Sequence, residues 1–371
     1  MVRGQLVATC ALVLHAFDAL GAQQPPTLRL ETPEGQAPHE YLEIAALRVL
    51  PNGELLVADA RDERLFRFSP STGERRPIGR KGSGPGEYLG ALALVALRAD
   101  TTVFPDMANG RWHLLVGERI VATWSAEHPW VARVRGGLTG ADDRGHLYLR
   151  RRLSAATTIG PFRADSLALV RFSTETSRED TIVRLRSRPS SGASSRAAQA
   201  NPLAAQAFGI PMLVGEQALA YPDGWVATVR LNPYRVEWLS PSGTVVRGPS
   251  IPVQTIKVTE EEKAAFQERE QRDLGRPVRV SSSHPWPEEA DPVEDAALVA
   301  AADGALWVRL RSPAKDSTVT YQVIGRDGRV RMQVVMPRDL RVLALSSGRA
   351  YVRTIDDDGY HRLEWYRIPI R

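Results

Sequence analysis

Short apolar segments alternate with tight polar turns along most of the chain, which is the pattern of β-strands joined by hairpins. Residues 50–73 (LPNGELLVADARDERLFRFSPSTG) contain an apolar strand, a turn, a second strand and a third. Residues 97–117 (LRADTTVFPDMANGRWHLLVG) repeat this order. Three polar residues recur at one spacing of 47 positions, namely Asp59, Asp62 and Arg64 as Asp106, Asn109 and Arg111. The chain is therefore predicted to repeat one small β unit.

The turn between the first two strands of this unit recurs along the whole chain. It is found six times, at Gly53, Asp100, Gly145, Gly224, Gly304 and Gly348. Three of the steps between turns are 44 to 47 residues long, which fits a four-stranded propeller blade of about 40 to 50 residues. The sequence predicts an all-β chain over 23–371, folded as a six-bladed β-propeller of four-stranded antiparallel blades.

The two remaining steps, of 79 and 80 residues, indicate an insertion in each. Residues 186–206 are rich in Ser, Ala and Arg, a composition typical of a flexible loop. Residues 254–292 carry helix signals, with Thr259 as N-cap, Glu262 completing a capping box and Gly275 as the stop. We expect a solvated helix on the propeller surface, and a partner-binding helix is the alternative.

The last blade lacks a strand. After Gly348 the chain has room for two strands, and the strand before the turn makes three. Residues 27–31 (TLRLE) are predicted to supply the fourth strand and thereby to close the ring. A strand from the other end of the chain would also cover an otherwise unpaired sheet edge.

The N-terminal residues 1–22 have the pattern of a secretory signal peptide. A cation at Arg3 precedes an apolar stretch from Leu6 to Leu14, and small residues follow up to Ala22. The apolar stretch is shorter than the roughly 18 residues that a membrane-spanning helix needs. We expect cleavage near Ala22 and an exported chain, periplasmic or extracellular, with no membrane span. An uncleaved anchor or a misplaced start is the alternative.

The composition is that of a soluble globular protein, with 43% hydrophobic and 25% charged residues. The formal net charge is +5, but Arg is interspersed with Asp and Glu and forms no block. We therefore expect no nucleic-acid partner. Cys10 is the only cysteine and lies in the leader, so no disulfide is expected in the mature chain.

A glycine-rich stretch, residues 78–88 (IGRKGSGPGEY), follows the first repeat. Phosphate-binding loops end in Gly-Lys-Ser/Thr and lead directly into a helix. Here Lys81 comes early and Gly86 is followed by Glu87. We interpret the stretch as the connection between two blades, in which glycines adopt φ values that other residues avoid.

Four segments of the chain carry a family resemblance. Residues 57–68 (VADARDERLFRF) resemble the NHL repeat, and residues 79–88 are similar to the connections between blades in exported bacterial propellers of the NHL and TolB-type group. Residues 232–238 (NPYRVEW) and 258–263 (VTEEEK) are similar to that group as well. The resemblance implies a six-bladed propeller from a group in which most members lack an assigned activity. Blades 3, 5 and 6 lack the Asp/Asn/Arg trio, so NHL-type binding roles are not implied for them.

Catalytic signatures are sparse. The seven histidines show no HExxH or other short-range metal-ligand spacing, and no GxSxG motif is present. We therefore expect no catalytic residues, no metal ligands and no cofactor. The alternative is a metal-dependent propeller lyase or hydrolase that binds Ca²⁺ or Zn²⁺ in the central channel with ligands from different blades.

A group of charged residues at corresponding positions of the six blades is found by counting from the turns. The end of the second strand of each blade should lie near the mouth of the central channel. The charged residues at these positions, here called the rim residues, are Asp59, Asp106, Arg151, Arg230, Arg309 and Arg353. They could bind an anionic or zwitterionic ligand through charge-assisted hydrogen bonds. The alternative is that they pair with acids nearby, such as Asp59 with Arg64, and hold neighbouring blades together.

These features favour an exported, non-enzymatic propeller that binds a protein, peptide or glycan through its loop-rich face. The prediction depends partly on analogy of fold, which does not determine function.

Overall fold

The computed structural model describes five stretches of the chain, 24–133, 137–159, 162–187, 210–274 and 286–369. The predicted leader, 1–22, and nearly all of the predicted loop insertion, 186–206, lie outside these stretches, so both stay predictions.

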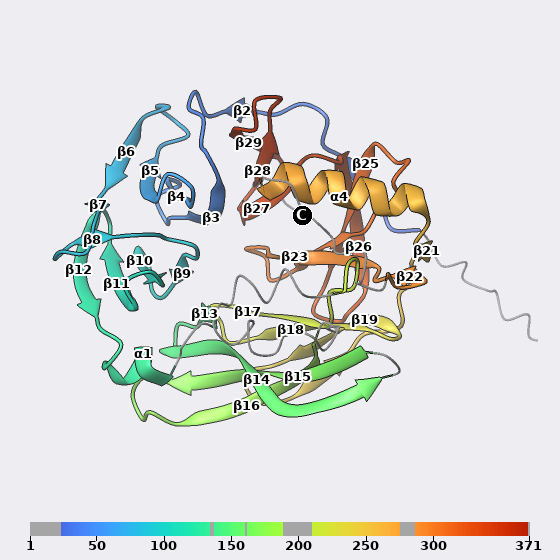
Figure 1. The fold of residues 1–371 in the computed structure, drawn as a ribbon, viewed down its shortest axis with the longest axis horizontal. Helices are drawn as coiled ribbons and strands as arrows, with labels where there is room; N and C mark the ends of the chain where they lie inside the picture. The colour runs from blue at the N-terminus through green and yellow to red at the C-terminus, as the bar shows by residue number, and fades with distance from the viewer. Residues whose placement is uncertain (1–23, 134–136, 160–161, 188–209, 275–285, 370–371) are drawn as a thin grey trace, which may run out of the picture.

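Six blades, each built on four antiparallel strands, are arranged around a common centre, which confirms the predicted fold class (Figure 1). The sheet of blade 5 has one additional strand. Blade 1 consists of β3 (Ile44–Val49), β4 (Leu55–Asp59), β5 (Arg64–Phe68) and β6 (Arg75–Ile78). Blade 2 consists of β9 (Val95–Ala96), β10 (Thr101–Asp106), β11 (Arg111–Val116) and β12 (Arg119–Trp124). Blade 3 consists of β13 (Leu138–Ala141), β14 (His146–Ile159), β15 (Phe162–Ser173) and β16 (Glu179–Arg186).

Blades 4 to 6 have the same order of strands. Blade 4 consists of β17 (Gln217–Ala220), β18 (Val226–Leu231), β19 (Tyr234–Leu239) and β20 (Val245–Arg247). Blade 5 contains β23 (Val293–Ala300), β24 (Leu306–Leu310), β25 (Thr318–Ile324) and β26 (Val330–Pro337). Blade 6 consists of β27 (Arg341–Ser346), β28 (Arg349–Ile355), β29 (His361–Arg367) and β2 (Gly35–Gln36). A short helix, α1 (Pro129–Arg133), lies between blades 2 and 3.

The predicted turns join the two innermost strands of each blade. Each of the six joins the first strand of a blade to the second, and the five turn glycines have φ between 81° and 85°, which is the left-handed region that only glycine adopts readily. First strands of neighbouring blades contact one another, for example β17 with β23 and β27 with β3. They therefore line the central channel.

Apolar side chains fill the space between adjacent blades. In the cluster that joins blades 4 and 5, Val236, Trp238 and Val308 are completely buried. Burial of such surface stabilises the fold by about 25 cal/mol per Å². Each blade thus depends on its neighbours for its core.

The ring is closed by N-terminal residues, as predicted. The prediction that residues 27–31 form the last strand of blade 6 is wrong, because other residues form it. The outer strand of blade 6 is β2, Gly35–Gln36, which pairs antiparallel with β29. Residues 27–31 instead contribute β1 (Thr27–Arg29), which pairs parallel with β26 as a fifth strand of blade 5. The closing position requires Gly35, because a Cβ there would lie 2.4 Å from the ring of Trp365.

The glycine-rich stretch connects blades 1 and 2, as interpreted from the sequence. It contains a two-stranded parallel sheet, β7 (Arg80–Lys81) with β8 (Glu87–Tyr88). The Glu87 carboxylate accepts a hydrogen bond from the Gly84 N–H at 2.7 Å. A Cβ at Gly82 would lie 2.2 Å from that carboxylate, so glycine is needed for this close approach.

The predicted helix is present as α4, Glu260–Leu274, in the insertion between blades 4 and 5. The Thr259 hydroxyl accepts a hydrogen bond from the Glu262 N–H at 3.4 Å, as expected of an N-cap. The helix lies across one face of the propeller (Figure 1). Every side chain from Glu260 to Arg272 is at least partly exposed. Among the described residues, no helix is long and apolar enough to cross a membrane.

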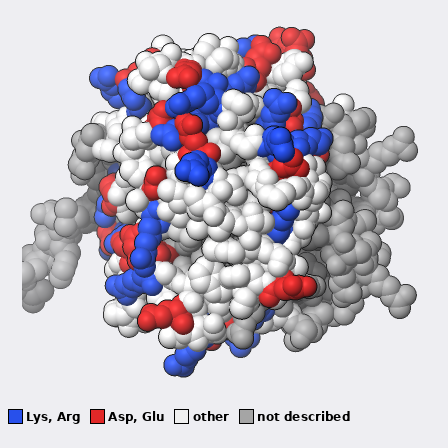
Figure 2. All heavy atoms as spheres, turned by 90° about the vertical axis from the view of Figure 1, so that its left-hand side faces the viewer, with Lys and Arg blue, Asp and Glu red and all other residues white. Residues whose placement is uncertain are grey.

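The side formed by blades 1 and 2 carries charges of both signs. Figure 2 shows Lys and Arg interspersed with Asp and Glu on this side. Some of these residues pair, for example Arg76 with Glu118 at 3.0 Å and Arg67 with Glu54. On this side the charges are therefore distributed as the sequence indicated.

Candidate functional site

The six rim residues all lie in the second strands of their blades, β4, β10, β14, β18, β24 and β28. These strands run toward the face that carries the connections between blades, such as residues 79–94, 248–274 and 286–292. This face is here called the loop-rich face. Although their positions in the blades correspond, their surroundings differ.

Two of the rim arginines bind glutamates of their own blades. Arg151 contacts both carboxylate oxygens of Glu179, at 2.7 and 3.0 Å. Arg230 contacts Glu237 at 2.9 Å and Glu216 at 2.8 Å. The charge of each guanidinium is thus compensated within the blade.

Arg309 is the most deeply buried of the rim arginines, with 4% of its surface exposed. It contacts Glu294 at 2.8 Å and donates to the carbonyls of Leu340 and Arg338, which lie between blades 5 and 6. Burial would lower the pKa of Arg309, but the charge of Glu294, the Tyr321 side chain and the hydrogen bonds to both together outweigh burial and raise that pKa above its usual value. Arg309 therefore remains charged and holds blade 5 to blade 6.

Asp59 binds main-chain groups rather than its expected partner. Its carboxylate accepts hydrogen bonds from the N–H groups of Leu42 at 2.8 Å and Glu43 at 2.9 Å, immediately before blade 1 begins. Arg64 instead lies 3.7 Å from Asp62. The predicted pairing of Asp59 with Arg64 is therefore wrong, because the buried carboxylate is used to bind unpaired N–H groups.

Asp106 occupies the corresponding place in blade 2 and is fully buried. It contacts the Asn109 side chain at 2.7 Å, the Leu89 N–H at 3.3 Å, His113 at 3.4 Å and Arg111 at 3.5 Å. Burial would raise the pKa of Asp106, but the hydrogen bonds from His113, Asn109 and the main chain outweigh it and lower that pKa. The expected contact between Asp106 and Arg111 is confirmed.

Arg353 lies near the junction of blades 6 and 1. Burial, together with the nearby charges of Arg353 and Arg61, lowers the pKa of His361 to about 3. The neutral His361 ring accepts the Ile44 N–H at its Nδ1 atom, at 2.9 Å. This hydrogen bond joins β29, the third strand of blade 6, to β3, the first strand of blade 1.

Most of the rim residues thus have partners within the protein, as expected if they hold chain segments together. A ligand role for them stays a prediction.

A separate cleft of about 590 Å³ opens on the loop-rich face between blades 4 and 5. It is lined by residues from five segments, 186–187, 213–216, 231–234, 250–255 and 289–292. These are ends of strands and connections between blades, where main-chain groups and polar side chains are accessible.

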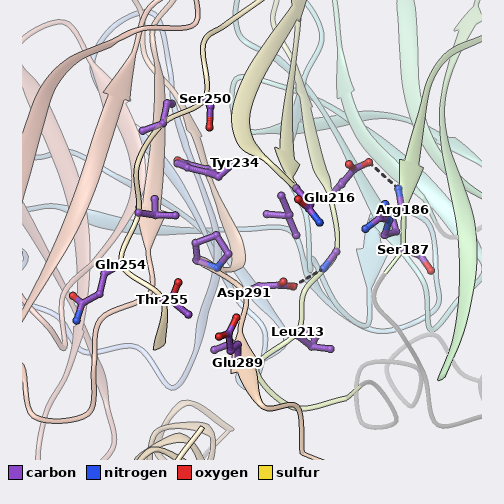
Figure 3. A pocket seen from close by; sticks show the side chains of 17 residues that line it. Arg186, Ser187, Leu213, Glu216, Tyr234, Ser250, Gln254, Thr255, Glu289 and Asp291 are labelled. Carbon is purple, nitrogen blue, oxygen red and sulfur yellow. Dashed lines mark hydrogen bonds between the residues drawn. The ribbon is translucent and has the colours of Figure 1, made fainter. Parts of the chain in front are cut away.

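Polar side chains face one another across this cleft. Figure 3 shows Ser250, Gln254 and Thr255 on one side and Arg186 and Glu216 on the other. In the same view, Asp291 and Glu289 lie between the two sides. The cleft therefore offers both donors and acceptors of hydrogen bonds.

Two of the carboxylates in the cleft are held in place by main-chain groups (Figure 3). Asp291 accepts the N–H of Val214 at 2.7 Å and that of Gly215 at 3.3 Å. Glu216 accepts the N–H of Arg186 at 2.9 Å. Side chains fixed in this way lose little conformational freedom when a ligand binds.

Positive charges compensate the acids of the cleft. Glu216 is also bound by the rim residue Arg230, so this rim position adjoins the cleft. Arg311 donates to the main-chain oxygen of Asp291 at 2.9 Å. Together with Arg186, these arginines place positive charge beside the carboxylates of Asp291, Glu216 and Glu289, which line the cleft.

Sequence reasoning did not find this cleft. Its lining comes from segments of blades 3, 4 and 5 that are far apart in the sequence, and no motif joins them. The only available signal was the unusual length of the connection over 254–292, which marked the junction but not the residues.

No group of three or more His, Cys, Asp or Glu side chains that could hold a metal ion is found within the described stretches.

Comparisons with known proteins yield structural likeness alone. No family model matches the chain, and no curated protein matches it. Among solved structures, a member of the DUF4221 family from Bacteroides vulgatus is similar at 8% identity and a TM-score of 0.45, with 91% of this chain and 98% of that chain covered. A protein named as exported from Bacteroides fragilis is similar at 11% identity and a TM-score of 0.44, covering 92% and 99%.

Virginiamycin B lyase from Staphylococcus aureus, in a catalytically inactive form with quinupristin, is similar at 9% identity and a TM-score of 0.43, covering 90% and 97%. Likeness at these levels carries no conclusion about the function of this chain.

Proposed function

We propose that this chain is an exported, non-enzymatic binding protein of the NHL and TolB-type propeller group that takes a polar ligand, a short peptide or glycan, on its loop-rich face. The observation that carries the proposal is the cleft between blades 4 and 5. Its volume of about 590 Å³ falls within the range of about 300 to 1,000 Å³ typical of small-molecule sites.

The lining supports a ligand rich in hydroxyl or amide groups. The carboxylates of Asp291 and Glu216 are oriented by main-chain N–H groups, and the side chains of Asn232, Ser250 and Gln254 add donors and acceptors. The Tyr234 ring gives one wall an apolar surface. Fixed polar groups beside an apolar surface are typical of sites that orient a polar ligand.

Export depends on the leader pattern in residues 1–22. Mass spectrometry of the protein recovered outside the cytoplasm should find an N-terminus between residues 22 and 25. An intact Met1 on cytoplasmic protein would contradict export without affecting the cleft.

Binding can be tested by a thermal-shift screen of the purified mature protein against uncharged oligosaccharides and short peptides. A raised melting temperature that depends on ligand concentration supports the proposal. No shift with any member of either collection contradicts it. Metal analysis of the same sample adds a second criterion, because a stoichiometric Ca²⁺ or Zn²⁺ that chelators remove would favour the metal-dependent lyase or hydrolase instead.

A further inference from the structure

The wall of the cleft is also the base of the helical insertion. The insertion leaves the propeller through β21 (Ile256–Lys257) and returns through β22 (Glu289–Ala290), and these two strands pair with each other. Gln254 and Thr255, directly before β21, line the cleft, as do both residues of β22. A movement of this two-stranded base therefore changes the shape of the cleft.

Helix α4 packs on the segment that leads back to this base. The Phe266 ring contacts the Trp286 ring edge to face, with 5.8 Å between centroids, and the Lys263 ammonium lies 5.8 Å from the same indole ring. Trp286 stands only three residues before β22. The helix and the base are thus linked through one aromatic side chain.

Polar contacts between described residues hold the helix to blade 5. Arg269 lies 3.4 Å from Glu294 of β23, and the Glu262 carboxylate accepts the Ala314 N–H at 2.7 Å. Glu294 is three residues after Asp291, which lines the cleft. One anchor of α4 and one wall of the cleft therefore belong to the same short stretch of backbone.

We propose that helix α4 and the cleft form one coupled unit, in which a ligand in the cleft changes how firmly α4 is docked on blade 5. The proposal rests on the binding function proposed above and adds a regulated element to that site. Coupling between two sites is reciprocal, so if a ligand in the cleft changes the docking of α4, a change in that docking must in turn affect the cleft. This reciprocity allows a test that needs no ligand.

The test is hydrogen–deuterium exchange of the full chain, comparing wild type with Arg269→Ala. That substitution removes the contact with Glu294, which keeps its contact with Arg309. The matched control is Arg272→Ala, since Arg272 pairs with Glu268 of the same helix at 3.0 Å. A second variant, Glu262→Ala, releases the other anchor, so the result does not depend on one substitution.

The expected result is faster exchange both in α4 and in the base of the insertion, including the Val258 N–H, which bonds the Glu288 carbonyl at 2.9 Å. The increase in the base should be at least about fivefold, the lower end of usual coupling strengths. Arg272→Ala should exchange like wild type in the base. Faster exchange confined to α4 in both test variants, or no change in either, overturns the coupling and leaves the binding proposal to its own screen.

Discussion

Two junctions between blades differ in the chain segments that cover them on the loop-rich face. One is the junction of blades 6 and 1, which closes the ring, and the other is the junction of blades 4 and 5. At the closure, the N-terminal segment is interlocked with the last blade: Leu30, Ala37 and Tyr41 are at most 4% exposed, and Gly35 lies against the Trp365 ring. At the junction of blades 4 and 5, the connection carries an insertion and leaves a cleft.

The interiors of the two junctions are alike. Trp238 and Val308 are fully buried between blades 4 and 5, as are Leu55 and Leu363 between blades 1 and 6. The difference is therefore confined to the connections. The comparison indicates that both junctions depend on a packed apolar core, and that the longer connection between blades 4 and 5 leaves a cleft above that core.

The largest effect is expected from removing the closing segment. A chain that begins at Ala37 lacks β1, β2 and the Glu34 carboxylate, which binds Arg349 at 2.7 Å. It should be largely insoluble or unfolded, because blade 6 loses its outer strand and β29 becomes an open edge.

A chain that begins at Glu34 is the matched comparison, since it loses β1 but keeps β2. We expect it to be soluble, with a melting temperature below that of the chain beginning at Gln23. Equal melting temperatures for the starts at Gln23 and Ala37 would contradict the account of ring closure.

A smaller but still large effect is expected for Arg309→Ala. The substitution leaves Glu294, 8% exposed, without its closest partner, and breaking such a buried pair costs about 3 to 5 kcal/mol. In Arg151→Ala the lost pair is at the surface, where Arg151 is 40% exposed, so the cost should be about 0 to 1 kcal/mol. Urea denaturation measures both, and equal costs would show that burial does not distinguish the two arginines.

The fold could be predicted from local features that repeat. Each turn glycine adopts φ near 80°, and a residue with that requirement is visible in the sequence. The closing strand could not be predicted, because Gly35–Gln36 has no apolar pattern and its position is determined by the Trp365 ring. The more strand-like residues 27–31 were therefore assigned to the wrong blade.

The candidate site was predictable only in part. Counting along the second strands found residues at corresponding positions, and one of them, Arg230, adjoins the cleft through Glu216. It identified the contact of Asp106 with Arg111, but it missed the main-chain N–H groups that Asp59 binds and the main-chain carbonyls to which Arg309 donates. Such contacts depend on backbone geometry rather than on residue type.

Arg230→Ala tests the second of the two junctions, that of blades 4 and 5, which carries the cleft. The variant removes one guanidinium from Glu237 and Glu216, both partly or fully buried, while Glu237 keeps Arg235 and Glu216 keeps the Arg186 N–H. It should be destabilised by about 1 to 3 kcal/mol, the usual range for losing hydrogen bonds to a charged group. Urea denaturation should give this loss, whereas unchanged or raised stability together with lost anion binding would favour the predicted rim site.

The closing junction should also respond to acid. The pKa of His361 is lowered from 6.5 to about 3 in the folded state, so the unfolded chain takes up a proton first and stability falls as the pH drops below about 6.5. Between pH 6.5 and 5 the loss should be about 1 to 2 kcal/mol. In His361→Asn, whose amide oxygen can still accept the Ile44 N–H, this part of the pH dependence should disappear. An unchanged pH profile in that variant would contradict the role assigned to His361.

The central claim is that the cleft between blades 4 and 5 is the binding site. The most direct test substitutes two serines, one in the connection between these blades and one in blade 4. Ser250 lines the cleft, whereas Ser242, in the turn between β19 and β20, does not. Both are exposed, so a tryptophan at either position should leave the fold intact. Using the oligosaccharide or peptide that gives the largest thermal shift with wild type, we predict that Ser250→Trp abolishes binding in titration calorimetry while Ser242→Trp binds as wild type does. Equal affinity of the two variants for that compound would contradict the claim.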